Sequence, residues 1–181
     1  GQVEGTVLRN GRPAVGARLR LVRTDSGERF GVGMPQQRTD QDGKFRFDRV
    51  EAGDYALLVH GDGAHARTVV DRSAISVTAN ATTEAHRDYS TCSVRGTVRA
   101  TDGALLDGTL YVLPDASETP ADVRRYAREN PVFRVTVRGG EFATDDVRAG
   151  NCLLLFERSG AEPTTWTRTL VVGENRIDLT P

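Results

Sequence analysis

The sequence predicts an all-β protein built from two tandem antiparallel β-sandwiches, with one short helix inserted in the second. Two observations support this fold class. Apolar and polar side chains alternate along most of the chain, as in Ala17-Arg18-Leu19-Arg20-Leu21, and this alternation is typical of strands with one buried face. The same succession of strand and turn residues also occurs twice, which indicates two domains of similar fold.

The two copies share four sets of residues in the same order. The first copy contains Val3-x-Gly5-x-Val7, Gly16-Ala17-x-Leu19-x-Leu21, Thr39-Asp40-Gln41-Asp42-Gly43-x-Phe45-x-Phe47 and Gly53-x-Tyr55-x-Leu57-x-Val59. The second contains Val94-x-Gly96-x-Val98, Gly108-x-Leu110-x-Val112, Gly140-x-Phe142 and Val147-x-x-Gly150-x-Cys152-x-Leu154-x-Phe156. A repeat of about ninety residues is a whole small domain, since solenoid units run roughly 20–50 residues. We therefore expect one domain over residues 1–89 and a divergent second copy over residues 90–181.

Turn signals separate the expected strands of the first copy. Asn10-Gly11, Asp42-Gly43 and Ala52-Gly53 supply residues that tolerate positive φ or form local side-chain hydrogen bonds. Short strands are expected between such turns, and the lack of a helical period makes the domain an antiparallel sandwich. In Val3-x-Gly5-x-Val7 the valines should face the core, and the glycine leaves room for another strand or a large ring.

The second copy carries six additional residues in its middle, because matching positions are offset by 91 before this stretch and by 97 after it. The stretch contains a helix signal, with Thr119 as N-cap, Pro120 at the first helical position and a stop at Asn130-Pro131. We expect a helix over residues 120–129, within an insertion at about 119–130.

One face of this expected helix is apolar. Val123, Tyr126 and Ala127 share it by their i, i+3, i+4 spacing, and we expect it to dock on the sandwich. The alternative is a helix that binds a partner, since three arginines lie mostly away from this face. The candidate surface for a partner or ligand consists of Arg124, Arg125, Tyr126, Arg128 and Trp166.

These motifs resemble the carboxypeptidase regulatory-like domain, a transthyretin-like, Ig-like β-sandwich related to the B-type repeats of bacterial surface proteins. The resemblance rests on V-x-G-x-V, G-A-x-L-x-L, T-D-x-D-G-x-F-x-F and G-x-Y-x-L-x-V, which the first copy matches across nearly its whole length. The second copy has Cys152 in place of the tyrosine and Arg138-Gly139-Gly140 in place of the Asp-x-Asp-Gly turn. The resemblance implies a spacer, stalk, adhesive unit or accessory domain, and it does not specify an activity.

Cys92 and Cys152 are the only cysteines, and both lie in the second copy. Cys92 shares strand parity with Val94, and Cys152 shares it with Leu154, so both sulfur atoms should point into the core. We expect a structural disulfide between them, which would indicate an oxidising, extracytoplasmic compartment. The alternative is two buried free thiols.

Metal and catalytic chemistry have little support in the residues. Asp40, Asp42 and Glu51 imitate three positions of a calcium loop, but Lys44 stands where that loop needs an oxygen ligand, so a hairpin turn is the better interpretation. A second weak grouping consists of His60, Asp62 and His65. One loop that supplies two imidazoles is loose support for a metal, so we predict neither a metal nor a cofactor. There is also no nucleophile elbow, phosphate-binding glycine loop or zinc signature, so we do not expect an enzyme.

The predicted function is a non-enzymatic structural spacer or protein-interaction module of a larger secreted or surface-associated bacterial protein. Its expected location is extracytoplasmic: secreted, periplasmic or at the cell surface. A net charge of −1 argues against nucleic acid, and no apolar run is long enough to span a membrane. The expected partners are other domains of the parent chain or a separate protein. The alternative is a carbohydrate-binding accessory module beside a catalytic domain, in which Trp166, among threonines, would stack on a glycan.

Overall fold

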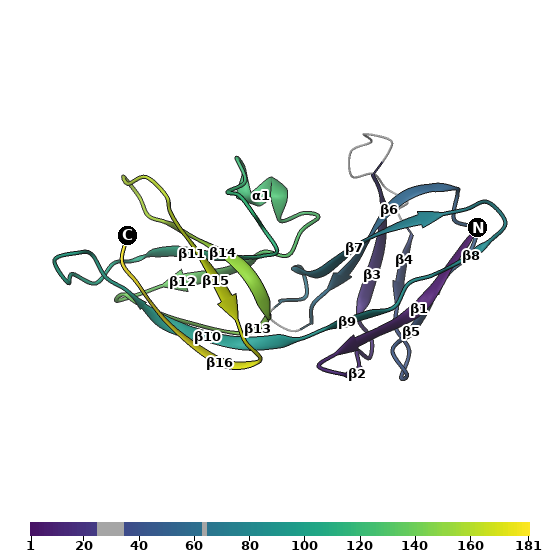
Figure 1. Cartoon of the computed structure of the whole chain (residues 1–181), viewed down its shortest axis with the longest axis horizontal. Helices are drawn as coiled ribbons and strands as arrows, with labels where there is room; N and C mark the ends of the chain where they lie inside the picture. The colour runs from purple at the N-terminus through teal and green to yellow at the C-terminus, as the bar shows by residue number, and fades with distance from the viewer. Residues whose placement is uncertain (25–34, 63–64) are drawn as a thin grey trace. The chain divides into compact units, whose positions relative to one another are not determined.

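The computed structural model describes residues 1–24, 35–62 and 65–181, and it confirms the nearly all-β fold class (Figure 1). These residues form sixteen strands and one short helix. The chain divides into two compact units, one containing Gly1–Tyr89 with Arg128–Asn130 and the other Ser90–Ala127 with Pro131–Pro181. Each unit contains two sheets.

The described residues of the first unit form nine strands. They are β1 (Gln2–Arg9), β2 (Arg12–Pro13), β3 (Arg18–Arg23), β4 (Gln36–Arg38), β5 (Lys44–Phe47), β6 (Gly53–His60), β7 (Val69–Val77), β8 (Thr82–Glu84) and β9 (Arg87–Tyr89). In one sheet β1 pairs with β2, β5, β8 and β9, and the other sheet has the order β4-β3-β6-β7. The alternating side chains bury one face of each sheet, so that Val3, Leu19, Phe45 and Leu57 are 5% exposed or less.

The second unit holds seven strands and the helix. They are β10 (Thr91–Val98), β11 (Gly108–Pro114), α1 (Val123–Tyr126), β12 (Phe133–Val137), β13 (Glu141–Arg148), β14 (Gly150–Glu157), β15 (Thr164–Leu170) and β16 (Gly173–Leu179). The strand orders of its two sheets are β13-β10-β16 and β12-β11-β14-β15. Leu110, Val112, Leu154 and Phe156 form part of the core between these sheets.

The first and last strands of each unit pair in parallel. In the first unit β1 pairs with β8 over Gln2–Glu4 and with β9 over Val7–Arg9. In the second unit β10 pairs with β16 from Cys92 to Val98. The remaining strand pairings of the described residues are antiparallel. The antiparallel sandwich therefore contains a parallel contact in each unit, because the last strand returns from the opposite sheet to lie beside the first.

Gly5 and Gly96 occupy equivalent places in the two units. Gly5 lies opposite Phe45 of its antiparallel neighbour, and Gly96 lies opposite Phe142. A Cβ atom at Gly5 would collide with the backbone of Ala85, and one at Gly96 would collide with the backbone of β16 and the ring of Phe142. The prediction that Gly5 leaves room for a close strand or ring is confirmed, and Gly96 has the same role in the second unit.

The helix is shorter than the predicted span of 120–129, and its N-cap is Asp122 rather than Thr119. The Oδ1 atom of Asp122 accepts hydrogen bonds from the backbone N–H groups two and three residues later, each at 2.9 Å. Both residue types can cap a helix, but aspartate is the stronger N-cap. The cap therefore lies three residues later than predicted, and α1 retains a single turn, Val123–Tyr126.

The apolar face of the helix packs against the outer face of the β11–β14 sheet. Val123 is buried there, and Tyr126 and Ala127 are partly buried against the same cluster. The buried members of this cluster are Tyr111, Leu113, Val123, Val132, Leu153 and Leu155. The predicted docking of the helix on the sandwich is confirmed.

Candidate functional site

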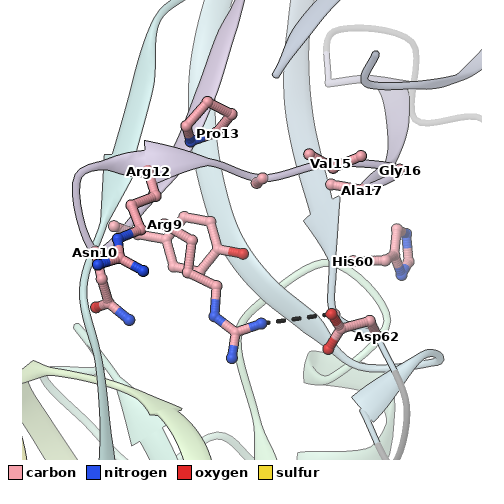
Figure 2. Close-up of a pocket in the computed structure, with 12 residues that line it drawn as sticks. Arg9, Asn10, Arg12, Pro13, Val15, Gly16, Ala17, His60 and Asp62 are labelled. Carbon is pink, nitrogen blue, oxygen red and sulfur yellow. Dashed lines mark hydrogen bonds and ion pairs between the residues drawn. The ribbon is translucent and has the colours of Figure 1, made fainter. Parts of the chain in front are cut away.

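A cavity of about 510 Å³ lies in the first unit (Figure 2). Its walls are the end of β1 with the turn that follows, the segment Arg12–Ala17, residues 60–62 and Tyr89. The turn is a two-residue hairpin loop, with Asn10 at φ 54° and Gly11 at φ 70°. These positive φ values match the twist of the flanking strands, as the sequence predicted for Asn-Gly.

This hairpin places two arginines at the cavity. Arg9 and Arg12 are cross-strand partners, so their side chains lie on the same face of the ribbon. Arg9 Nη1 lies 3.4 Å from Asp62 Oδ2, and this ion pair crosses the opening (Figure 2). The Asp62 side chain is 79% exposed, so water screens the pair and its contribution to stability is small.

The lining residues are suited to polar contacts with a ligand rather than to nucleophilic catalysis. They include guanidinium groups, one carboxylate and one imidazole, and they contain no serine, threonine or cysteine. His60 is 4% exposed, and neither ring nitrogen has a hydrogen-bond partner among the described residues. Burial, together with the charges of Arg18 and Arg20, lowers the pKa of His60 from 6.5 to about 4. His60 is therefore neutral at physiological pH.

The buried, neutral state of His60 predicts acid sensitivity. In the unfolded chain the imidazole takes up a proton near pH 6.5, whereas in the folded chain it does so only near pH 4. The free energy of unfolding is therefore highest above pH 6.5, where the imidazole is neutral in both states. As the pH falls toward 4, protonation of the unfolded chain lowers this free energy by up to about 3 kcal/mol. His60→Leu should flatten this part of a plot of unfolding free energy against pH.

His86→Gln is the matched control for this measurement, because the His86 side chain is 61% exposed. This variant keeps His60, so its profile should retain the steep part that His60→Leu loses. Equal slopes between pH 4 and 6.5 for the unmodified protein and His60→Leu would contradict the assignment.

Cys92 and Cys152 are buried free thiols, 5% and 1% exposed. They lie on β10 and β14, which belong to opposite sheets, and both are part of the core. Burial, together with the neighbouring Cys92, raises the pKa of Cys152 to about 11. Burial also raises the pKa of Cys92. The disulfide between them stays a prediction.

The residues of the candidate partner surface do not form one patch. Arg124, Arg125 and Arg128 are exposed, whereas Tyr126 packs in the cluster on the outer face of the β11–β14 sheet. Trp166 is half-buried and lies opposite Leu154, on the core face of the same sheet. The strongly exposed large apolar residues in the described chain are Val15, Leu105, Val171 and Val172, so none of them supplies an aromatic ring for a glycan.

The residues around Asp40 form a tight turn. Asp40 Oδ1 accepts hydrogen bonds from the backbone N–H groups of Asp42 and Lys44, at 2.9 and 2.8 Å. This confirms a turn at the calcium-like residues, but the turn is not a hairpin, because β4 and β5 on its two sides belong to different sheets. Among residues 1–24, 35–62 and 65–181, no three His, Cys, Asp or Glu side chains gather in a way that could hold a metal.

A buried ion pair was missed by the sequence reasoning. Asp71 of β7 has a side chain only 1% exposed, and it receives two hydrogen bonds from Arg87 of β9, 2.6 Å from Nε and 2.9 Å from Nη2. The pair joins the two sheets of the first unit. A signal was available, since Asp71 interrupts an apolar run at Val69-Val70.

These features define a protein of two β-sandwich units with an open polar cavity in the first. Residues 2–88 match the family described as the carboxypeptidase regulatory-like domain, so the first unit is a domain of this family. No curated protein matches the chain. No helix in the described part of the chain has the length and hydropathy needed to cross a membrane.

Similar solved structures extend over nearly the whole chain. The minor pilin of Streptococcus agalactiae is 16% identical, with 99% of this chain and 94% of that chain covered and a TM-score of 0.50. A streptococcal ancillary pilin is 14% identical, with 98% and 61% covered and a TM-score of 0.40. The major pilin subunit of Bacillus cereus is 9% identical, with 99% and 98% covered and a TM-score of 0.37. The first of these likenesses shows a shared fold.

Proposed function

We propose that this chain is a load-bearing structural spacer of a larger secreted or surface-associated bacterial protein, and that it is not an enzyme. The observation that carries the proposal is the parallel pairing of the first and last strands in each unit. Parallel neighbours begin at the same end of a sheet, so the chain enters at one end of the pair and leaves at the other. A pull on the two ends of a unit then loads the whole ladder of hydrogen bonds at once.

The registers give the direction of this load. In the first unit Gln2 lies beside Thr82 and Arg9 lies beside Tyr89, so β1 is pulled one way and β8 and β9 the other. In the second unit the ladder runs through seven consecutive pairs, from Cys92 and Gly173 to Val98 and Leu179. Several bonds must break together in this geometry, which raises the barrier to forced unfolding.

The placement of the reactive side chains also supports a structural role. Both cysteines and His60 are buried, and the carboxylate of Asp71 is held by Arg87. Their contacts contribute to the cores and to the junction between sheets. The fold shared with the minor pilin of Streptococcus agalactiae agrees with this role.

Single-molecule pulling tests the spacer role. Stretching the chain from its two ends should give two separate unfolding events, each releasing on the order of 300 Å of chain. For the second unit, handles at Ser90 and Pro181 load β10 against β16 along the strands, whereas handles at Ser90 and Val172 peel the same pair apart from one end. The first arrangement should need a clearly higher force. Equal forces in the two arrangements would refute the load-bearing role.

The disulfide belongs to this proposal, because an oxidising compartment outside the cytoplasm would allow the two core thiols to join. Protein from such a compartment should show no free thiols after unfolding without reductant, and a mass lower by two hydrogen atoms than the reduced form. The reduced, folded protein should react slowly with a thiol reagent, since a pKa of about 11 leaves on the order of one thiolate in a thousand at pH 8. Two free thiols in the unfolded, unreduced sample would refute the bridge.

A further inference from the structure

β15 is an edge strand with an open side. It is last in the order β12-β11-β14-β15, and among the residues that the structure describes it pairs with β14 alone, from Thr164 opposite Phe156 to Leu170 opposite Gly150. In an antiparallel pair, about half of the backbone N–H and C=O groups of an edge strand point away from its neighbour. β15 therefore presents a row of backbone donors and acceptors to any strand of matching length.

The strand carries few features that block such pairing. Its seven residues, TTWTRTL, contain one charge, and its register with β14 has no bulge. The edge strands of the opposite sheet differ, since β13 has a bulge in its pairing with β10 and β16 has three charges in seven residues. Charges and bulges are the usual protection of exposed edges. One local contact does cover β15, because Arg168 Nη1 donates to the carbonyl of Thr167 at 2.8 Å.

We propose that β15 pairs antiparallel with β15 of a second copy of this chain, around a two-fold axis at Thr167. The pairing would join two four-stranded sheets into one of eight strands. It rests on the structural role proposed above and deepens it by naming a partner, a second copy of the chain.

Symmetry restricts the register of this pairing. Directly opposed residues in a sheet point to the same face. A two-fold axis between two antiparallel copies of one strand must therefore lie between a residue and the same residue of the other copy. An axis at Thr167 pairs all seven residues of the strand. Axes at Trp166 or Arg168 pair only five, and the second of these places two arginines directly opposite each other.

The register at Thr167 also matches the side chains. Arg168 lies opposite Trp166 of the second copy, and this occurs twice by symmetry, so each guanidinium can leave its own backbone contact and lie on an indole ring. Thr165 lies opposite Thr169 of the second copy, and β-branched pairs of this kind stabilise sheets. Val171, 60% exposed, lies opposite Pro163 of the second copy, which covers apolar surface on both.

A single edge contact is small compared with stable interfaces, so the association should be weak, with a Kd on the order of 100 µM. Weak pairing of this kind becomes significant when copies are held close together, because tethering raises the effective concentration. It also sets the conditions of the test, which needs protein at high concentration or a covalent trap.

Cysteine trapping tests the register. Thr167→Cys places one new thiol opposite its own copy, at the Cα separation that a disulfide accepts, whereas Thr165→Cys lies opposite a threonine. Under mild oxidation of the full chain, Thr167→Cys should give at least tenfold more linked dimer than Thr165→Cys. The double variant Thr165→Cys/Thr169→Cys should restore linkage. The unmodified protein serves as background, since its two cysteines are buried.

Sedimentation of the reduced proteins gives an independent measure. Thr167→Lys opposes two like charges in the dimer and should raise the Kd threefold to fivefold, while Thr136→Lys on β12 should leave it unchanged. A monomer at millimolar concentration, equal linkage at positions 165 and 167, or dimerisation insensitive to Thr167→Lys would overturn the proposal. These outcomes leave the pulling experiment unaffected, because single molecules are pulled there.

Discussion

Gly96→Ala is expected to destabilise the second unit by about 3 kcal/mol or more. The new Cβ atom would meet the backbone oxygen of Ile177 on β16 and the ring of Phe142. The backbone of a strand in a parallel ladder cannot move aside without breaking its hydrogen bonds. The steric strain from the new Cβ atom therefore cannot be relieved by a small shift. Guanidinium titration followed by Trp166 fluorescence measures the effect, because this is the only tryptophan and it lies in the second unit.

Gly160→Ala is the matched control. Gly160 has φ 75° and open space around the position of a Cβ atom, so alanine there adds backbone strain without a collision. We expect a cost of about 1 kcal/mol. If Gly96→Ala cost no more than Gly160→Ala, the close approach of β16 to β10 would be wrong.

Arg87→Leu should destabilise the first unit by about 3–5 kcal/mol. It leaves the carboxylate of Asp71, 1% exposed, buried without the two hydrogen bonds that Arg87 donates. Circular dichroism during chemical denaturation measures the change. Arg46→Leu, which removes the exposed ion pair with Asp48, serves as the control and should have no measurable effect.

The double variant Asp71→Leu/Arg87→Leu separates a missing partner from lost packing. Replacing both members of a buried ion pair by apolar groups is often close to neutral, so the double variant should be more stable than Arg87→Leu alone. A double variant at least as unstable as the sum of the two single variants would show that the pair itself is not the cause.

The amino-acid pattern determined the faces of the strands, because a side-chain period of two is a property of the chain alone. It was sufficient for the inward position of Cys92 and Cys152, for the Asn10-Gly11 and Asp42-Gly43 turns, and for the role of Gly5. Each of these depends on local geometry or on the volume of one side chain.

The helix shows where local signals compete. Thr119 and Asp122 are both acceptable caps, and the spacing of apolar residues alone could not choose between them. Val123 and Tyr126 are the helix residues that pack on the outer face of the sheet, and the single helical turn contains both of them. The rest of the predicted span, on either side of this turn, is not helical.

The sequence by itself determined two sandwich units, their turns and their core faces. Only the tertiary structure decided which strands are neighbours: the parallel return of β8, β9 and β16, the Asp71–Arg87 pair, the cavity at Arg9 and Asp62, and the open edge at β15. The physical reason is that a strand's pattern specifies which side chains are buried, but a pairing partner is chosen among many strands of similar pattern by packing over the whole unit.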